Sequence, residues 1–232
     1  MMLIKAFGGL CNRLRVILSY LASNTSGVKF IWEVNSEVSY GHFRECFEPI
    51  EGVEFVEKPT EPIDITTFDV CGNAPRDWHH QFSKLTPKPH IEKRVRELQA
   101  RLKTPYAALH IRRTDHVELA KQFGRYTSDK EFLDFIRSIK NSLKIYLATD
   151  NASTQIAFRN ECGESVVYAE DILQSSRVRQ TSLEVAVIDL FVCAGSTVFK
   201  GSGFSSFSES VEWLRACSGV SISTLERTIR RL

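Results

Sequence analysis

Residues 105–116, PYAALHIRRTDH, decide the fold of this chain because they join an apolar run to a cluster of charges. The run YAALHI, residues 106–111, predicts a buried strand. A histidine, two arginines and an aspartate stand where this strand ends. Charged groups that leave a hydrophobic layer together need water, one another or a ligand. The end of this strand is therefore a candidate binding site.

Strand and helix signals alternate on both sides of this segment. The predicted strands are 2–7, 28–34, 53–57, 106–111, 143–149, 165–169 and 196–200. The predicted helices begin after Gly8-Gly9 and at residues 91, 128, 152, 183 and 205. Such alternation is typical of parallel sheets covered by helices on both faces.

A break divides this α/β pattern in two. Residues from about 60 to 90 hold five of the seven prolines and little periodicity, so we expect a loop-rich stretch there. We therefore predict two Rossmann-like parallel-sheet units. A short domain over residues 1–90 would precede a second domain over residues 91–232.

Composition narrows the classes of function. The formal net charge of +2 is too small to indicate a nucleic-acid surface. No apolar run approaches the roughly 20 residues that a membrane span needs, and the start MMLIKAFGG lacks the features of a signal peptide. We expect a cytoplasmic protein, although an excised lumenal catalytic domain would have the same composition.

Four polar clusters fall where predicted strands end, which is where open parallel sheets bind ligands. They are GGLCNRLR (8–15), HIRRTD (110–115), ATDN (148–151) and GSGFSS (201–206). If the strand continues, His110 and Arg112 point to one face of the sheet and Arg113 to the other. An arginine fork suits phosphate, but both arginines could equally pair with Asp115 and nearby carboxylates.

The two glycine-containing turns each precede a predicted helix. In GSGFSS, backbone N–H groups and two hydroxyls at a helix start would suit an anion, or the serine could be an ordinary N-cap. GGLCNRLR lacks the third glycine of a dinucleotide fingerprint and the Lys-Ser/Thr of a Walker loop. Its Arg13 and Arg15 could instead form a solvated helix face.

Asp189 lies inside the apolar helical run 183–194. A buried carboxylate without a partner is unfavourable, so it needs either a partner or a turn of the helix that faces water. The sequence holds no Asp-x-Asp pair and no His/Cys cluster at metal-ligand spacing, so we expect neither a metal nor another cofactor.

In their order, HIRRTD, YLATDN, the helix with Asp189 and GFSSF resemble the C-terminal half of GDP-fucose-dependent fucosyltransferases. The resemblance is nearest to the α1,6-fucosyltransferases, which include the bacterial nodulation enzyme, and more distant to the protein O-fucosyltransferases. GGLCNRLR resembles the glycine-rich turn of their N-terminal half. The resemblance implies a GT-B-like fold, with the donor site in the C-terminal unit and the acceptor side in the N-terminal one.

The resemblance also implies site residues. His110 and Asp189 would contact guanine, while Arg112 and Ser206 would hold the diphosphate. The other positions assigned to the GDP-sugar are Gly9, Asn12, Arg13, Arg113, Asp150 and Ser205, and Thr149 also matches a motif position. For catalysis we expect Arg112 and a general base, with Glu118 as the first candidate and Asp115 as the second. The chain departs from the family at His116 and at Asn151. It also has one extra residue in GSGFSS (residues 201–206), here called the serine turn, and a short first half.

The resemblance thus implies an inverting, metal-independent transfer of fucose from GDP-fucose, or of a sugar from a close GDP-sugar, to a glycan or protein hydroxyl. Two other classes stay open. The chain could bind a GDP-sugar without catalysis, as its short first half suggests. It could also be another phosphate-handling α/β transferase, such as a sulfotransferase or kinase, although the absence of a Walker loop counts against this class.

Overall fold

The computed structural model describes the chain except for residues 25, 35–40, 115–116, 140–142, 174–179 and 220–232. Its first sheet is parallel, with the strand order β3-β2-β1-β4. The strands are β1 (Met2–Ala6), β2 (Val28–Trp32), β3 (Val53–Phe55) and β4 (Ile65–Thr67). The first three confirm the strands predicted near residues 2, 28 and 53. They are joined by α1 (Leu10–Ser23) and the short α2 (Phe43–Cys46).

The second sheet is also parallel, in the order β7-β6-β5-β8. Its strands are β5 (Tyr106–Ile111), β6 (Lys144–Thr149), β7 (Val166–Val167) and β8 (Val198–Gly201). All six residues of β5 are buried, as expected for a strand between two neighbours and two helical layers. His110 lies opposite Ala148 of β6 and Gly201 of β8 in the register, so three of the predicted polar clusters start at one sheet edge.

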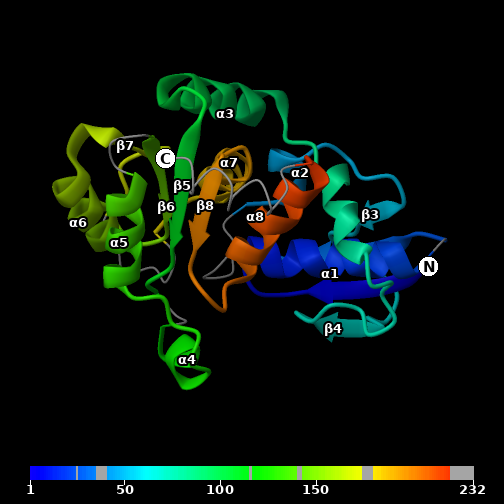
Figure 1. The fold of residues 1–232 in the computed structure, drawn as a ribbon. Helices are drawn as coiled ribbons and strands as arrows, with labels where there is room; N and C mark the ends of the chain where they lie inside the picture. The colour runs from blue at the N-terminus through cyan, green and yellow to red at the C-terminus, as the bar shows by residue number, and fades with distance from the viewer. Residues whose placement is uncertain (25, 35–40, 115–116, 140–142, 174–179, 220–232) are drawn as a thin grey trace.

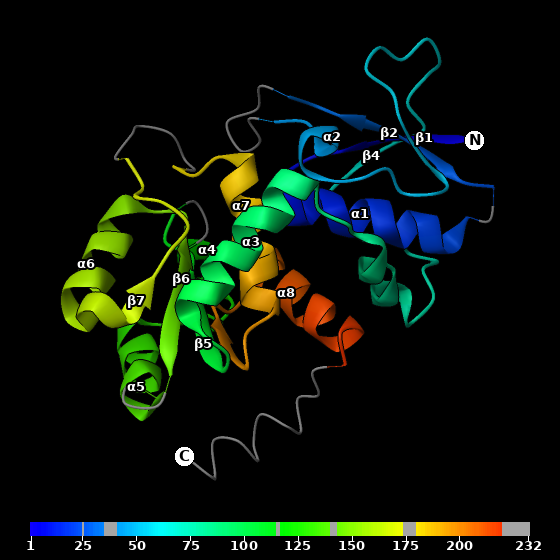
Figure 2. The same ribbon diagram turned by 90° about the horizontal axis from the view of Figure 1, so that it is seen from above.

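Helices surround and separate the two sheets (Figure 1). They are α3 (Pro89–Leu102), α4 (Val117–Gln122), α5 (Asp129–Ile139), α6 (Ala152–Cys162), α7 (Leu183–Ala194) and α8 (Ser206–Cys217), with 3-10 turns η1 (Trp78–Lys84) and η2 (Gly163–Ser165). Helix α8 lies between β8 and α1, and α3 crosses over α7 (Figure 2). The predicted α/β fold with two parallel-sheet units is confirmed.

Local signals explain where several helices begin. Ser128 and Glu131 form a capping box before α5, since each side chain accepts from the other's backbone N–H, at 3.3 and 2.8 Å. The side chain of Asn151 caps α6 and that of Ser182 caps α7. Helix α7 is apolar nearly all round because it is buried between the two sheets.

One apolar core joins the two sheets. It runs from Ile4 of β1 and Leu14 of α1 through Leu190 of α7 and Val211 of α8 to Ala108 of β5. A second, smaller core fills the space between the other face of the second sheet and α5 and α6. The C-terminal helices therefore cover the first sheet as well as the second, which fixes the two halves against each other.

The stretch predicted to be loop-rich contains two elements, β4 and η1. Strand β4 has only three residues and is stabilised by its pairing with β1. Trp78 and Phe82 of η1 pack on Trp213 of α8. These partners lie far away in the sequence, so local patterns do not reveal them. Helix α3 begins at Pro89, and the domain boundary at residues 90 and 91 stays a prediction. Among the described residues, no helix is long and apolar enough to span a membrane.

Candidate functional site

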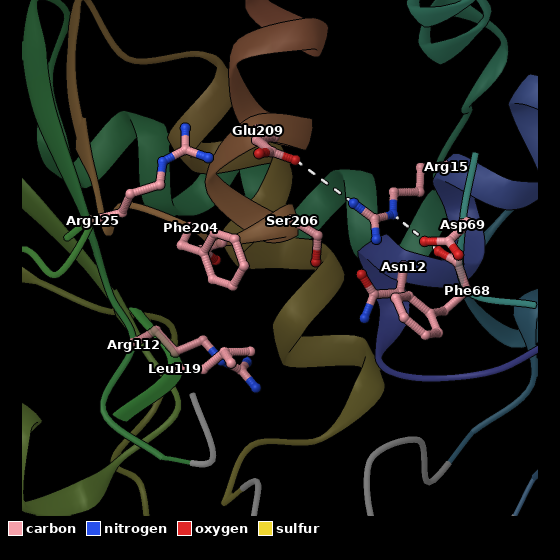
Figure 3. A pocket seen from close by; sticks show the side chains of 11 residues that line it. Asn12, Arg15, Phe68, Asp69, Arg112, Leu119, Arg125, Phe204, Ser206 and Glu209 are labelled. Carbon is pink, nitrogen blue, oxygen red and sulfur yellow. Dashed lines mark hydrogen bonds and ion pairs between the residues drawn. The ribbon is translucent and has the colours of Figure 1, made fainter. Parts of the chain in front are cut away.

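A cleft of about 480 Å³ lies between the two halves of the molecule, which is within the usual range for ligand sites (Figure 3). Its second-half wall comes from the loop after β5, from α4 and from the start of α8, and its first-half wall from α1 and the loop after β4. The lining residues are Asn12, Arg15, Phe68, Asp69, Arg112, Leu119, Arg125, Phe204, Ser205, Ser206 and Glu209. Four of the predicted site residues are among them: Asn12, Arg112, Ser205 and Ser206.

Arg112 reaches this cleft from the carboxyl end of β5. Its backbone N–H donates to Ser202 Oγ at 2.9 Å, and the backbone N–H of Ser202 donates to the carbonyl oxygen of His110 at 2.9 Å. These bonds tie the β5 loop to the serine turn after β8. The Arg112 guanidinium lies 3.2 Å from Asp150 Oδ2, within an ion pair that is largely buried.

Asp150 fixes the loop that carries Arg112. Its carboxylate accepts from the backbone N–H of Arg113 at 3.2 Å and from Thr114 Oγ1 at 2.6 Å. A buried carboxylate with several donors holds those donors in place. Asp150 is therefore positioned to orient Arg112, although it does not line the cleft itself.

Arg113 points to the other face, as strand alternation predicts. Its guanidinium donates to Asp129 Oδ1 at 2.6 Å and to the carbonyl oxygen of Thr127 at 3.0 Å, and it lies over the rings of Tyr126 and Phe132. The structure thus places Arg113 at the start of α5, outside the cleft lining.

The serine turn brings a helix start to the cleft. Phe204 has a positive φ of 57°, which is unusual for a side chain of this size and directs the chain sharply into α8. Ser205 is the N-cap residue and makes no capping hydrogen bond with its side chain. Ser206 is the first helical residue. The first backbone N–H groups of α8, together with the cations of Arg112 and Arg125, make this corner attractive to an anion.

His110 lies near the carboxyl end of β5, on the face of the second sheet that α8 covers. Its Nδ1 is 2.9 Å from Ser208 Oγ, and its ring stacks on Phe207 with centroids 4.3 Å apart. The side chain is buried and does not line the cleft. Its orientation is therefore set by α8.

Asp189 is also on this side of the sheet, on α7. It accepts a hydrogen bond from the Tyr146 hydroxyl at 2.6 Å, and it lines a small separate cavity beside Thr149 and Tyr168. Burial raises the pKa of the Asp189 carboxyl to about 7, against the lowering effect of the Tyr146 hydrogen bond. The structure thus gives this carboxylate a partner and does not bring it to the cleft wall.

The predicted residues at the start of α1 differ in what their side chains contact. Asn12 lines the cleft. Arg13 is buried: it donates to the carbonyl oxygens of Gly8 at 2.8 Å and Glu33 at 2.6 Å, and it lies over the Trp32 ring. Gly9 is the N-cap residue of α1, and its carbonyl oxygen accepts from the backbone N–H of Arg13. Arg13 therefore holds the turn in place, and only Asn12 of this group faces the cleft.

Of the two predicted bases, Glu118 is a described residue, and it is not among the residues that line the cleft. The side chain of Glu118 is 80% exposed on α4 and forms an ion pair with Lys121 at 2.8 Å. Asp115 lies outside the described residues. The described part of the chain holds no group of three His, Cys, Asp or Glu side chains arranged for a metal ion.

Several cleft residues were not predicted. Arg125 follows α4, and Phe68 and Asp69 follow β4, and neither element has a clear sequence pattern. Arg15 was within GGLCNRLR, but nothing in the sequence distinguished a cleft residue from a solvated one. Its guanidinium lies 3.8 Å from Glu209 of α8, so it bridges the two halves.

A family model described as GDP-fucose protein O-fucosyltransferase matches residues 28–218. No curated protein matches the sequence.

Solved structures share the fold. The NodZ α1,6-fucosyltransferase soaked with GDP-fucose is 14% identical, with a TM-score of 0.61 over 92% of this chain and 92% of that chain. NodZ from Bradyrhizobium gives 14% identity and a TM-score of 0.60 over 91% and 92%. POFUT1 in complex with GDP gives 11% identity and a TM-score of 0.61 over 94% and 95%. At these identities the likeness concerns the fold alone.

Proposed function

Because the chain belongs to the GDP-fucose protein O-fucosyltransferase family, we propose that it transfers fucose from GDP-fucose to the hydroxyl group of an acceptor. Membership confirms the resemblance inferred from the HIRRTD and GFSSF motifs and identifies the chain as a glycosyltransferase with a GT-B-like fold. The donor assignment rests on one observation. Arg112, Arg125 and the start of α8 meet in a single cleft at the carboxyl edge of the second sheet.

These groups suit a diphosphate. A guanidinium offers two parallel N–H donors to phosphate oxygens, and the first backbone N–H groups of α8 point in the direction that anions prefer. Fucosyl transfer leaves negative charge on GDP as the bond from fucose C1 to the diphosphate breaks. Fixed cations and dipoles at that position lower the barrier because they are already oriented when the charge develops.

Guanine would bind deeper, near His110 and Asp189. Guanine presents adjacent N1–H and exocyclic N–H donors, and one carboxylate can accept both. Asp189 accepts from the Tyr146 hydroxyl, and an ionised carboxylate has room for several more donors. The location of both residues on the α7 and α8 side of the second sheet supports this role.

The transfer would be inverting and independent of a metal. Arg112 and Arg125 supply the positive charge that a divalent cation supplies elsewhere, which is consistent with the absence of an Asp-x-Asp pair from the sequence. An acceptor hydroxyl would attack C1 from the side opposite the leaving GDP, while a base takes its proton.

Two measurements test this function. In a thermal-shift panel of GDP-fucose, GDP, GDP-mannose, UDP-sugars and ADP, we expect GDP and GDP-fucose to raise the melting temperature most, since a ligand stabilises the state that binds it. Chromatography of GDP-fucose incubated with the protein, with and without acceptors, should show GDP release.

Two other results would each favour one of the alternative functions. Binding of GDP-fucose without hydrolysis or transfer would identify a non-catalytic GDP-sugar-binding protein. Preference for ADP would indicate another phosphate-handling transferase.

A further inference from the structure

The exposed phenylalanines gather at the cleft. All 15 phenylalanines lie among the described residues, and only three are exposed. Phe68 (44%) lines the first-half wall and meets Phe7 (38%) edge to face, with centroids 5.1 Å apart. Phe123 (61%) stacks at 5.0 Å on Phe204 of the opposite wall. Exposed apolar surface gathered in one place marks a ligand or partner site.

A carboxylate stands next to Phe68. The backbone N–H of Asp69 donates to Thr67 Oγ1 at 2.8 Å, which fixes the turn after β4, and the Asp69 side chain lines the cleft. Within the described residues, no hydrogen bond or ion pair engages this carboxylate. Glu209, the other carboxylate among the described residues of the lining, is paired with Arg15.

The two walls differ in chemistry (Figure 3). Arg112, Arg125 and Ser206 lie on the second-half side, and Phe68 and Asp69 lie across from them beside α1. The cationic wall suits the leaving diphosphate. The opposite wall also holds Arg15, but its guanidinium is engaged by Glu209 and by the carbonyl oxygen of Phe68. The aromatic ring of Phe68 beside the Asp69 carboxylate therefore suits a neutral group that has an apolar face and hydroxyl donors.

We infer that Phe68 and Asp69 form the acceptor subsite, that it takes a sugar ring of a glycan, and that Asp69 is the general base. This inference rests on the proposed function. A pyranose presents a C–H face that packs on an aromatic ring and an edge of hydroxyl groups that a carboxylate accepts. A single group with both features matches this wall.

The reaction balances without a further reactant. The acceptor oxygen forms a bond to fucose C1 while its proton passes to Asp69. The bond from C1 to the diphosphate oxygen breaks, and its electron pair leaves with GDP beside Arg112 and Arg125. Asp69 then releases the proton to solvent.

Binding is tested first, on the GDP-loaded protein, by saturation-transfer NMR with methyl β-glycosides of glucose, galactose and N-acetylglucosamine and with a short peptide that contains serine and threonine. We expect at least one glycoside to bind through its C–H protons. Phe68→Ala should weaken it by about tenfold, the value of one aromatic contact, and leave GDP affinity unchanged. Ile63→Ala removes an exposed apolar side chain of the same half outside the cleft and should have no effect.

Catalysis is tested with the glycoside that binds. Asp69→Asn should lower kcat on the order of 10²-fold or more, because proton transfer in the transition state is lost, while the affinities for GDP and glycoside change little. Asp77→Asn, an exposed carboxylate elsewhere in the first half, should behave as wild type.

Three outcomes would overturn the inference: binding of the peptide alone, glycoside binding that Phe68→Ala leaves intact, or full kcat in Asp69→Asn. Failure of GDP itself to bind would instead overturn the proposed function.

Discussion

Arg112 and Asp150 form an ion pair across the carboxyl ends of β5 and β6, with Nη1 and Oδ2 3.2 Å apart and only 11% and 9% of their side-chain surfaces exposed. Asp150 also accepts from Thr114 Oγ1 and from the backbone N–H of Arg113. The loop that carries the cation is thus held by the same carboxylate that pairs with it. This arrangement presents Arg112 to the cleft already oriented, so little side-chain entropy is lost when an anion binds.

We predict that Arg112→Ala weakens GDP binding by about 2–5 kcal/mol, since one side of a desolvated charged pair is removed. Arg112→Lys should not restore affinity, because an ammonium group keeps the charge and loses the two-point fork. Isothermal calorimetry measures both effects. Arg137→Ala removes an exposed guanidinium on α5 and serves as the control. Unchanged GDP affinity in a folded Arg112→Ala variant would contradict the phosphate role.

Metal chelation should leave turnover nearly unchanged. With EDTA present, we expect GDP release from GDP-fucose to stay within about twofold of the untreated rate, far from the loss of several kcal/mol that removal of a Lewis-acid metal causes. The assay is chromatographic quantification of GDP. Abolition by EDTA with recovery on addition of Mg²⁺ or Mn²⁺ would refute the metal-independent mechanism.

The elements with strong local patterns could be predicted from the sequence. The run predicted over 183–194 is helix α7 with the same bounds, and the run predicted over 106–111 is β5. Strand alternation also separated Arg113 from Arg112, and the structure places the Arg113 guanidinium beside α5. A continuous apolar run and the alternation of side chains along a strand are local properties of the chain, so they can be recognised in the sequence without knowledge of tertiary contacts.

The first-half wall of the cleft could not be predicted, because it depends on distant contacts. Strand β4 is held by β1, and the cleft residues Phe68 and Asp69 follow it directly. Arg125 reaches the cleft on a loop that the hydrogen bond from Gly203 to Thr127 ties down. The sequence likewise could not show that Arg13 would be buried against Trp32 and backbone carbonyls.

Gly203→Ala tests the serine turn. A Cβ at this position would overlap the carbonyl oxygen of Arg125, so the turn and the Arg125 loop would have to separate. We expect a loss of about 1–3 kcal/mol in the free energy of unfolding, as for other overpacked sites, together with weaker GDP binding. Gly72→Ala is the matched control, since a Cβ there meets nothing within 4 Å. Equal urea midpoints and equal GDP affinities for the two variants would show that the close approach at Gly203 does not matter.

Asp189→Asn should change how stability depends on pH. The pKa of this carboxyl is about 7 in the folded chain, where burial raises it from 3.8. Between these values the folded state keeps a proton that the unfolded state releases, so the free energy of unfolding falls as pH rises, by at most roughly 4 kcal/mol. Asparagine does not titrate and still accepts from Tyr146. In urea unfolding at about pH 5 and pH 8, the free energy of unfolding of the variant should therefore rise relative to that of wild type at the higher pH. The same difference in free energy of unfolding at both pH values would rule out this titration.

Asp189→Asn also tests base recognition. Asparagine keeps the shape of the side chain but replaces one acceptor oxygen with a donor, which would face a donor of guanine. Buried hydrogen-bonding groups discriminate strongly because a mismatched base leaves them unpaired. We expect GDP affinity to fall by roughly 2–4 kcal/mol and ADP affinity to change much less, so that the preference for GDP narrows. Calorimetric titration of both proteins with both nucleotides measures this preference. Equal weakening toward GDP and ADP, in a variant that melts much earlier, would instead show that Asp189 serves the packing of α7 against Tyr146.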